Sequence, residues 1–494
     1  MARLLQILAA AAAVGGLAGS SFALNPNMGS DEDGKETVET RLLKILKDRG
    51  VLKDAEFDEL LQLGRQMREQ ELLTTSALDK EIRELADKIA TQGDAKKAAP
   101  ETKVSYKFGK GLNVAQGDNF SMGIGGRLQS RFSYISPDGL TSAGQDDRPT
   151  FDTRRVRISF DGFVFDKNLE YKIQFDTTPA ASILRDAYFD YKFAPEFHLR
   201  SGQMKRPFSR QAWTSSGDLQ VVERASTVER FRSLAGDRDA GLLAWGELGE
   251  AKTLEWYAGV FNGEGLNNGT PNAVALGTSS GGLGAANQSN NDSSGLEFVT
   301  RFVFNPNGPP GYSEGDLDKT EDAKLAFAIQ YDFNPERRGN PLGIGGIAAP
   351  LLPTYDVHTV GGDFVMKYQG LFLTSEFYYR EIVPTDRLND GAGPNTSTET
   401  GWFAQAGYFF GEEKGKGPEF AMRYAQIDFD QNIAPATAFG GDTKIDDYTA
   451  AFSYYFAGHN LKLQAAYTYR VRNLRFLDAN AEDQIFQIQA QVKL

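Results

Sequence analysis

The chain has 494 residues, a net charge of −13, three histidines and no cysteine. The acidic balance argues against a nucleic-acid-binding protein, which normally presents a basic face, and the lack of cysteine excludes disulfides, thiolate catalysis and cysteine zinc sites. The negative mean hydropathy argues only against membrane helices, because a transmembrane strand keeps one polar face. With 34 Phe, 19 Tyr and 52 Gly, the composition is typical of an outer-membrane barrel.

Residues 1–23 have the organisation of a secretory signal peptide. Arg3 supplies the positive start, residues 4–18 form a continuous apolar run, and Ser21-Phe22-Ala23 is a small-x-small cleavage site. The apolar run is too short to cross a membrane comfortably as a helix. The sequence therefore predicts an exported protein that is cleaved after Ala23.

Residues 24–100 predict a periplasmic helical arm that ends in a polar linker. Apolar residues recur there at heptad-like spacing in two stretches, each only about two heptads long. The two stretches are Val38, Leu42, Ile45 and Leu52, and Leu78, Ile82, Leu85 and Ile89. Two interpretations stay open: a helical hairpin with a solvated charged face, or a short coiled-coil-like arm that holds three copies together beneath a trimeric barrel.

From residue 101 to residue 494 the apolar residues alternate with polar ones, as they do in strands with two different faces. The last strand shows this most clearly, with Phe486, Ile488 and Ala490 separated by glutamines. Sixteen strands are predicted, near residues 119–135, 151–165, 168–178, 183–193, 196–204, 238–248, 252–262, 293–305, 320–334, 357–368, 371–382, 400–411, 416–431, 443–457, 460–475 and 480–494.

The connections between these strands alternate between long and short along most of the chain. Long outer loops and short periplasmic turns produce this alternation in outer-membrane barrels, and closure leaves no strand edge unpaired in lipid. The sequence therefore predicts an all-β domain, a sixteen-stranded antiparallel transmembrane barrel. The connection at residues 306–320 is an exception, because it is long where a short turn is expected. Aromatic residues near strand ends are expected to form interfacial girdles: Tyr188, Tyr191, Tyr378, Tyr379, Tyr454, Tyr455 and Phe456.

Basic residues outnumber acidic ones in the connection at residues 205–237, within an otherwise acidic chain. Guanidinium groups can replace the hydration shell that an anion loses in a narrow pore. The candidate anion-guiding residues of this connection are Lys205, Arg206, Arg210, Arg224, Arg230 and Arg232. The arginines expected on the wall of the lumen are Arg155, Arg157, Arg200, Arg301, Arg423, Arg470 and Arg472, with Lys493 on the same side. The alternative for each is an ion pair with a lumen carboxylate, such as Asp176 or Asp190, that only orders the wall.

Other motifs indicate no catalytic site, metal site or cofactor. The acidic run Asp316, Asp318, Glu321 and Asp322 has oxygen ligands that calcium could use, but it lacks EF-hand spacing. A solvated loop is the favoured interpretation of this run. No histidine stands in a triad pattern, and the glycine-rich stretches do not join a strand to an amphipathic helix.

Several short stretches, in this order and spacing, resemble the phosphate-selective porin O and P family. They are Phe151-Asp-Thr-Arg-Arg-Val-Arg-Ile158, Tyr171-Lys-Ile-Gln-Phe-Asp176, Asp186-Ala-Tyr188, Gly202-Gln-Met-Lys-Arg-Pro-Phe208, Val222-Glu-Arg-Ala225, Arg238-Asp-Ala-Gly241 and Phe261-Asn-Gly263. The resemblance implies a trimeric barrel of sixteen strands, a third long loop that folds inward to narrow the pore, and basic residues that guide anions.

We therefore predict an outer-membrane porin, a water-filled channel for passive diffusion of small hydrophilic solutes that prefers anions such as phosphate or polyphosphate. The expected partners are outer-membrane lipid and lipopolysaccharide, small anionic solutes, two further copies in a homotrimer and peptidoglycan, but no nucleic acid. Two alternatives stay open: a structural tether whose arm binds peptidoglycan, and a specific channel for organic anions or sugars.

Overall fold

The computed structural model describes residues 102–137, 147–178, 184–232, 237–263, 295–338, 354–385, 396–429, 442–474 and 479–494, and eight residues between 47 and 62. The chain divides into two units, Met1–Ala99 and Pro100–Leu494. In the first unit all the described residues except Lys53 are helical, among them Lys47, Asp54 and Phe57. The predicted signal peptide and nearly all of the predicted arm lie outside the described residues. No helix in the described ranges is long and apolar enough to cross a membrane.

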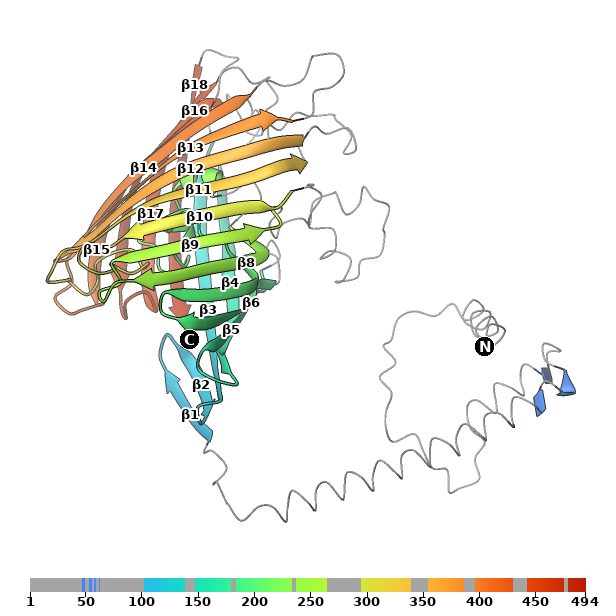
Figure 1. Cartoon of the computed structure of the whole chain (residues 1–494). Helices are drawn as coiled ribbons and strands as arrows, with labels where there is room; N and C mark the ends of the chain where they lie inside the picture. Colours follow the sequence, from blue (N-terminus) through green and yellow to red (C-terminus); the bar gives the residue numbers. More distant parts are fainter. Residues whose placement is uncertain are drawn as a thin grey trace, which may run out of the picture. The chain divides into compact units, whose positions relative to one another are not determined.

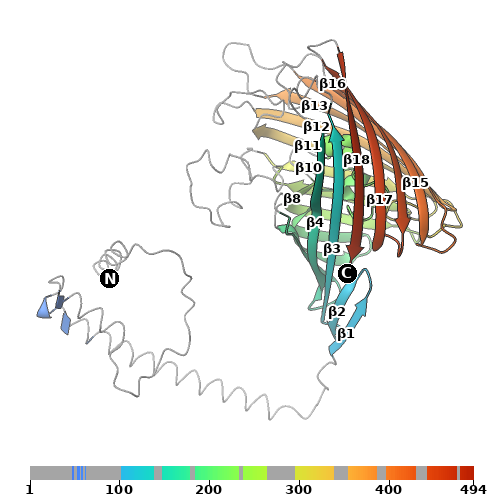
Figure 2. The ribbon, with the colours of Figure 1, turned by 180° about the vertical axis from the view of Figure 1, so that it is seen from behind.

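The second unit contains an antiparallel barrel of sixteen strands, β3 to β18, in which each strand pairs with the next and β18 pairs with β3 (Figures 1 and 2). Each predicted strand corresponds to one observed strand, so the predicted fold of this unit is confirmed. The strands are β3 Phe120–Ser136, β4 Arg148–Val164, β5 Leu169–Asp176, β6 Leu184–Ala194, β7 Phe197–Lys205, β8 Arg238–Leu248, β9 Leu254–Phe261, β10 Glu297–Phe304, β11 Lys324–Arg338, β12 Thr354–Tyr368, β13 Leu371–Pro384, β14 Ser397–Phe409, β15 Gly417–Phe429, β16 Asp442–Tyr455, β17 Leu461–Leu474 and β18 Ala479–Lys493.

A hairpin of two short strands, β1 Thr102–Lys107 and β2 Gly111–Gln116, precedes the barrel and was not predicted. β2 pairs with the first part of β3, which extends beyond the segment of β3 that pairs with β18. Gly111 has a positive φ of 79°, and a Cβ there would lie 1.9 Å from the carbonyl oxygen of Ile124. Only glycine therefore fits where the hairpin meets β3.

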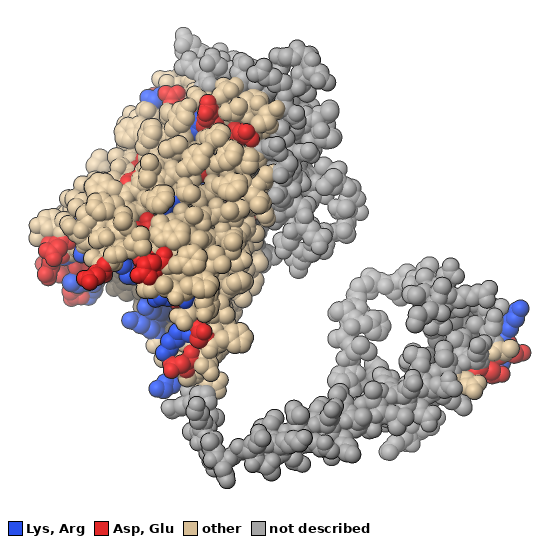
Figure 3. Space-filling view, viewed as in Figure 1, with Lys and Arg blue, Asp and Glu red and all other residues tan. Residues whose placement is uncertain are grey.

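The two faces of the barrel wall differ in chemistry along every strand. In β11 the outward side chains Phe327, Ile329 and Tyr331 are exposed, whereas the inward side chains Ala326 and Gln330 are buried. Figure 3 shows a wall with few charged side chains, which gather mainly at the end of the barrel that carries the hairpin, with a smaller number at the opposite end. An apolar outer band above a charged rim is what a membrane-spanning barrel requires.

Three of the predicted girdle residues face the interior instead, so that part of the girdle prediction is wrong. Tyr378 and Tyr455 are completely buried, and Tyr188 shares the inward face of β6 with Asp186 and Asp190. In the pairs Tyr378-Tyr379 and Tyr454-Tyr455, consecutive residues of a strand must point to opposite faces. One tyrosine of each pair therefore has to enter the barrel.

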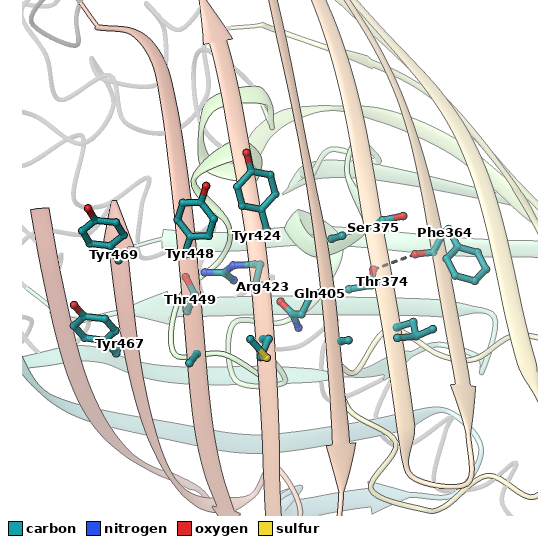
Figure 4. Close-up of a pocket in the computed structure, with 15 residues that line it drawn as sticks. Phe364, Thr374, Ser375, Gln405, Arg423, Tyr424, Tyr448, Thr449, Tyr467 and Tyr469 are labelled. Carbon is teal, nitrogen blue, oxygen red and sulfur yellow. Dashed lines mark hydrogen bonds between the residues drawn. The ribbon is translucent and has the colours of Figure 1, made fainter. Parts of the chain in front are cut away.

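The outer face of β13 to β17 carries a depression of about 590 Å³. Its lining includes Ala404, Ala406 and Ala450 and the tyrosines of β15, β16 and β17, which Figure 4 labels. Tyr448 is half exposed, so the depression opens to the lipid side of the wall. Arg423 contributes to its lining, but the Arg423 guanidinium donates to carbonyls on the other side of the wall, in the lumen.

Candidate solute pathway

The connection between β7 and β8 spans residues 205–237; its described residues, 205–232 and 237, fold into the lumen and are called the inner loop. It contains two short helices, α4 Arg210–Trp213 and α5 Ser226–Phe231 (Figure 1). The Glu223 carboxylate contacts arginines of β3 and β4, while the Leu219 carbonyl accepts a hydrogen bond of 2.7 Å from Lys462 on β17. The inner loop therefore contacts strands that are widely separated along the barrel sequence.

Local capping and apolar packing hold the inner loop in this conformation. The Ser209 hydroxyl accepts a hydrogen bond from the Ala212 backbone and caps α4 at its start. The Lys205 ammonium donates to the carbonyls of residues 212, 213 and 214 at 2.7–2.9 Å, which satisfies the end of α4. Phe231 is fully buried, and its ring stacks on Tyr378 of β13 with centroids 5.2 Å apart.

Glu223 is the main ionic anchor of the inner loop. Its carboxylate pairs with Arg131 at 2.7 Å, Arg154 at 2.5 Å and Arg155 at 3.2 Å. Burial favours the protonated form of Glu223, but the charges of Arg155 and Arg154 outweigh it and lower the pKa of this carboxyl to about 2. Glu223 is therefore ionised throughout the physiological pH range.

The long connection between β10 and β11, residues 305–323, enters the barrel from the end that carries the short turns, and we call it the inner turn. The Glu314 carboxylate accepts hydrogen bonds from the Gln211 side chain at 2.7 Å and the Gln220 backbone at 2.8 Å, both in the inner loop. Asp316 is buried and accepts hydrogen bonds from the backbones of Thr320 and Gly370. The expected solvated loop is therefore wrong for Asp316, which binds backbone donors of two turns, whereas Asp318, Glu321 and Asp322 of the acidic run are exposed.

The six candidate residues of the inner loop all have polar partners. Arg206 is buried and donates to the Glu297 carboxylate at 2.5 and 2.7 Å, and Arg230 pairs with Glu399. Arg232 pairs with Glu229 at 2.7 Å. The other three donate to backbone carbonyls: Lys205 as described above, Arg210 to Gly311, and Arg224 to Gln211 and Thr214.

The structure places the seven candidate wall arginines on the inner face. Six of them pair with carboxylates and Arg423 donates to carbonyls of the inner loop. The pairs are Arg155–Glu223, Arg157–Asp176, Arg200–Asp190, Arg301–Asp363, Arg470–Asp447 and Arg472–Asp483. Asp176 and Asp190 are thus partners that the sequence analysis named.

Sequence reasoning missed Arg127, which is central to the basic part of the wall. Arg127 lies opposite Lys493 of β18 on one side and opposite Arg157 of β4 on the other, and Asp176 of β5 follows Arg157. Lys493, Arg127, Arg157 and Asp176 are called the basic row. Arg127, Gln129 and Arg131 stand at every second position of β3, and this polar spacing could have identified Arg127 as an inward residue.

The family comparison agrees with this architecture. The family model for phosphate-selective porin O and P matches residues 122–494. The chain belongs to this family. It is therefore an outer-membrane porin, a channel for small solutes, and both family and fold are typical of non-enzymatic channels.

Individual relatives are distant. An uncharacterised protein of Aquifex aeolicus (strain VF5) is 23% identical over 320 residues, which cover 62% of this chain and 66% of the relative. The outer-membrane channel DcaP of Acinetobacter baumannii is 12% identical, with a TM-score of 0.48 over 76% of this chain and 100% of that one. The anion-selective porin from Comamonas acidovorans is 13% identical, with a TM-score of 0.48 over 76% and 99% of the two chains.

Proposed function

We propose that this porin conducts small anions, phosphate among them, in preference to cations. The basic row is the observation that carries the proposal. It places the cations Lys493, Arg127 and Arg157 side by side on three adjacent strands, with the single carboxylate of Asp176 at its end. Like charges directly opposite each other destabilise a sheet, so this arrangement favours an anion in the lumen beside it.

The surroundings of Arg127 support the same conclusion. Its guanidinium donates to the hydroxyls of Ser215 at 3.1 Å and Ser216 at 2.9 Å, at the tip of the inner loop. In the described part of the chain no carboxylate oxygen lies within 4.0 Å of the Arg127 guanidinium nitrogens. Lys493 pairs with Asp218 of the same loop, so the row keeps an excess of one positive charge.

The thirteen candidate basic residues of the loop and wall contribute little net charge beyond this excess, because nine of them pair with carboxylates within 3.2 Å. Most of their donors already bond to carboxylates or carbonyls, so we assign the uncompensated positive charge to Arg127, whose side chain is buried under the tip of the inner loop. The electric field of charges on the wall extends only about a Debye length into the pore water. A narrow lumen keeps the anion within that distance.

The ratio of chloride to potassium permeability, measured from the reversal potential in a KCl gradient across a planar bilayer, tests the proposal. The native channel is expected to prefer chloride, and Arg127→Gln is expected to lower the ratio by about twofold. Lys167→Gln is the control, because Lys167 lies in the exposed β4–β5 turn outside the lumen. A cation-selective native channel would refute the proposal, and no conductance at all would favour the structural tether.

We further propose a homotrimer in a lipopolysaccharide-containing membrane, with residues 24–100 as a periplasmic arm that helps to assemble it or binds peptidoglycan. The heptad-like spacing in the arm supports this. Deletion of residues 24–100 followed by chemical cross-linking tests the assembly. Trimers that persist unchanged would show that the arm is not the oligomerising element, and native protein that cross-links only as a monomer would refute the trimer.

A further inference from the structure

We infer that the lumen binds ring-bearing organic anions, such as aromatic carboxylates, on a row of aromatic side chains along β7, β8 and β9. The inference rests on the proposed anion channel and specifies its substrate class. His198, Trp245 and Tyr257 face each other in register on these strands. The His198 and Trp245 rings stack with centroids 3.9 Å apart, and Trp245 and Tyr257 are nearly parallel at 6.1 Å. These three side chains are called the ring row.

The inner loop and the inner turn extend the ring row away from the wall. Trp213 of α4 meets Tyr257 edge to face at 5.6 Å, and Tyr312 of the inner turn lies 6.4 Å from Trp213. Trp213 and Trp245 both stay partly exposed. Aromatic surface is therefore in contact with water beside the segments that narrow the lumen.

Cationic groups lie next to these rings. The Arg200 guanidinium lies 5.6 Å from the Trp245 ring and 4.5 Å from the Tyr188 ring, and the Asp190 carboxylate holds it at 2.6 Å. Lys192, opposite His198 in register, is exposed. A ligand ring could stack on the indole face of Trp245 while its carboxylate meets the ammonium of Lys192.

The position of the rings distinguishes this site from ordinary barrel aromatics. Porin interiors are mostly polar, and inward aromatics of this barrel such as Tyr378 and Tyr455 are completely buried, whereas Trp213 and Trp245 stay partly exposed. Of the four tryptophans, Trp256 and Trp402 lie on the lipid face, since Trp256 contacts outward Phe197 and Trp402 is exposed on the outer face. Trp213 and Trp245 instead face the lumen. A planar organic anion can stack on their rings, whereas inorganic phosphate cannot.

Channel block by three anions tests the inference: benzoate, cyclohexanecarboxylate of similar size without an aromatic ring, and inorganic phosphate. We expect benzoate to block KCl conductance at the lowest concentration. Trp245→Leu should raise the half-blocking concentration of benzoate about fivefold, whereas Trp245→Phe should retain most of the affinity. Both variants lose the hydrogen bond of 2.9 Å from the indole N–H to Asp190, so only the ring differs. Trp256→Leu on the outer face is the control.

A fluorescence measurement covers the case in which Trp245→Leu does not fold. In a Trp256→Phe/Trp402→Phe protein the emission comes only from the two lumen tryptophans, and 4-nitrobenzoate should quench it saturably. Equal block by benzoate and cyclohexanecarboxylate, tighter block by phosphate, or linear quenching without saturation would each overturn the inference. These results would leave anion selectivity intact, whereas a cation-selective reversal potential would refute the proposed function itself.

Discussion

Glu223→Gln is the most direct perturbation of the inner loop. The substitution keeps the size of the side chain and removes its charge, which leaves Arg131, Arg154 and Arg155 without their common carboxylate. Arg131 keeps Asp152 as a partner at 2.6 Å, whereas the guanidinium groups of Arg154 and Arg155 are left to repel each other. We expect the middle of the inner loop to detach from this wall.

The magnitude follows from the acidity of Glu223. Its pKa is about 2, compared with an ordinary glutamate value near 4.3. A tenfold change in acidity corresponds to about 1.4 kcal/mol, so the arginines stabilise the ionised form in place by about 3 kcal/mol. Breaking a buried ion pair typically costs a similar amount, about 3–5 kcal/mol. The ratio of attached to detached loop should therefore fall by roughly a hundredfold.

Single-channel recording at pH 7 measures this change. The variant should show a second, larger conductance level and more current noise than the native channel, because the loop leaves the lumen for part of the time. Glu229→Gln is the matched control on the same loop, since the Glu229 side chain is 43% exposed and pairs only with loop arginines.

The pH dependence provides an independent check. The folded pKa of Glu223 is depressed, so its contribution is complete above the ordinary glutamate value and is lost only as the pH falls toward about 2. Between pH 8 and pH 5 Glu223 stays ionised and keeps the loop attached, so the conductance of the native channel should not change through this residue. If Glu223→Gln and Glu229→Gln give the same recordings as the native protein, the arginine cluster does not hold the loop.

Two further predictions concern buried polar groups. Arg301→Met should lower the free energy of unfolding by about 3–5 kcal/mol, because it leaves the buried Asp363 carboxylate without its partner at 2.6 Å. The double variant Arg301→Met/Asp363→Leu should recover most of this loss. Urea unfolding in detergent measures both changes. At His459, burial and the nearby Lys462 charge lower the pKa of the imidazole well below its usual value. The Nδ1 atom of His459 accepts a hydrogen bond of 3.1 Å from Lys462, so the ring is neutral in the folded protein. Only the unfolded chain then binds the proton below about pH 6.5, so stability should fall as the pH drops below that value; His459→Gln should reduce this dependence of the melting temperature, and an identical dependence would contradict the assignment.

The strands of the barrel could be predicted from the sequence because both faces of each strand meet constant environments. Lipid on one side and polar groups on the other impose a period of two residues that is visible without any partner. The hairpin β1–β2 escaped prediction because it is short and all six residues of β1 are exposed. No constant environment imposes a pattern on such a strand.

The direction of the wall arginines was predictable for the same reason, but their partners were not. Arg206 pairs with Glu297 and Gln220 with Glu419, across 91 and 199 positions of the chain. Such contacts exist only after the barrel has closed and the inner loop has folded into it. The composition of the loop therefore indicated a positive field, whereas the structure shows that most of that charge is already neutralised.

The amino-acid pattern alone was sufficient for the barrel, its number of strands and the unusual length of the connection near residues 306–320. Tertiary structure decided that this connection enters the lumen, that Arg127 stands beside Lys493 and Arg157, and that Trp213 approaches Tyr257. The physical reason is that strand periodicity is a local property of the chain, whereas the chemistry of the lumen arises between segments that only closure of the sheet brings together.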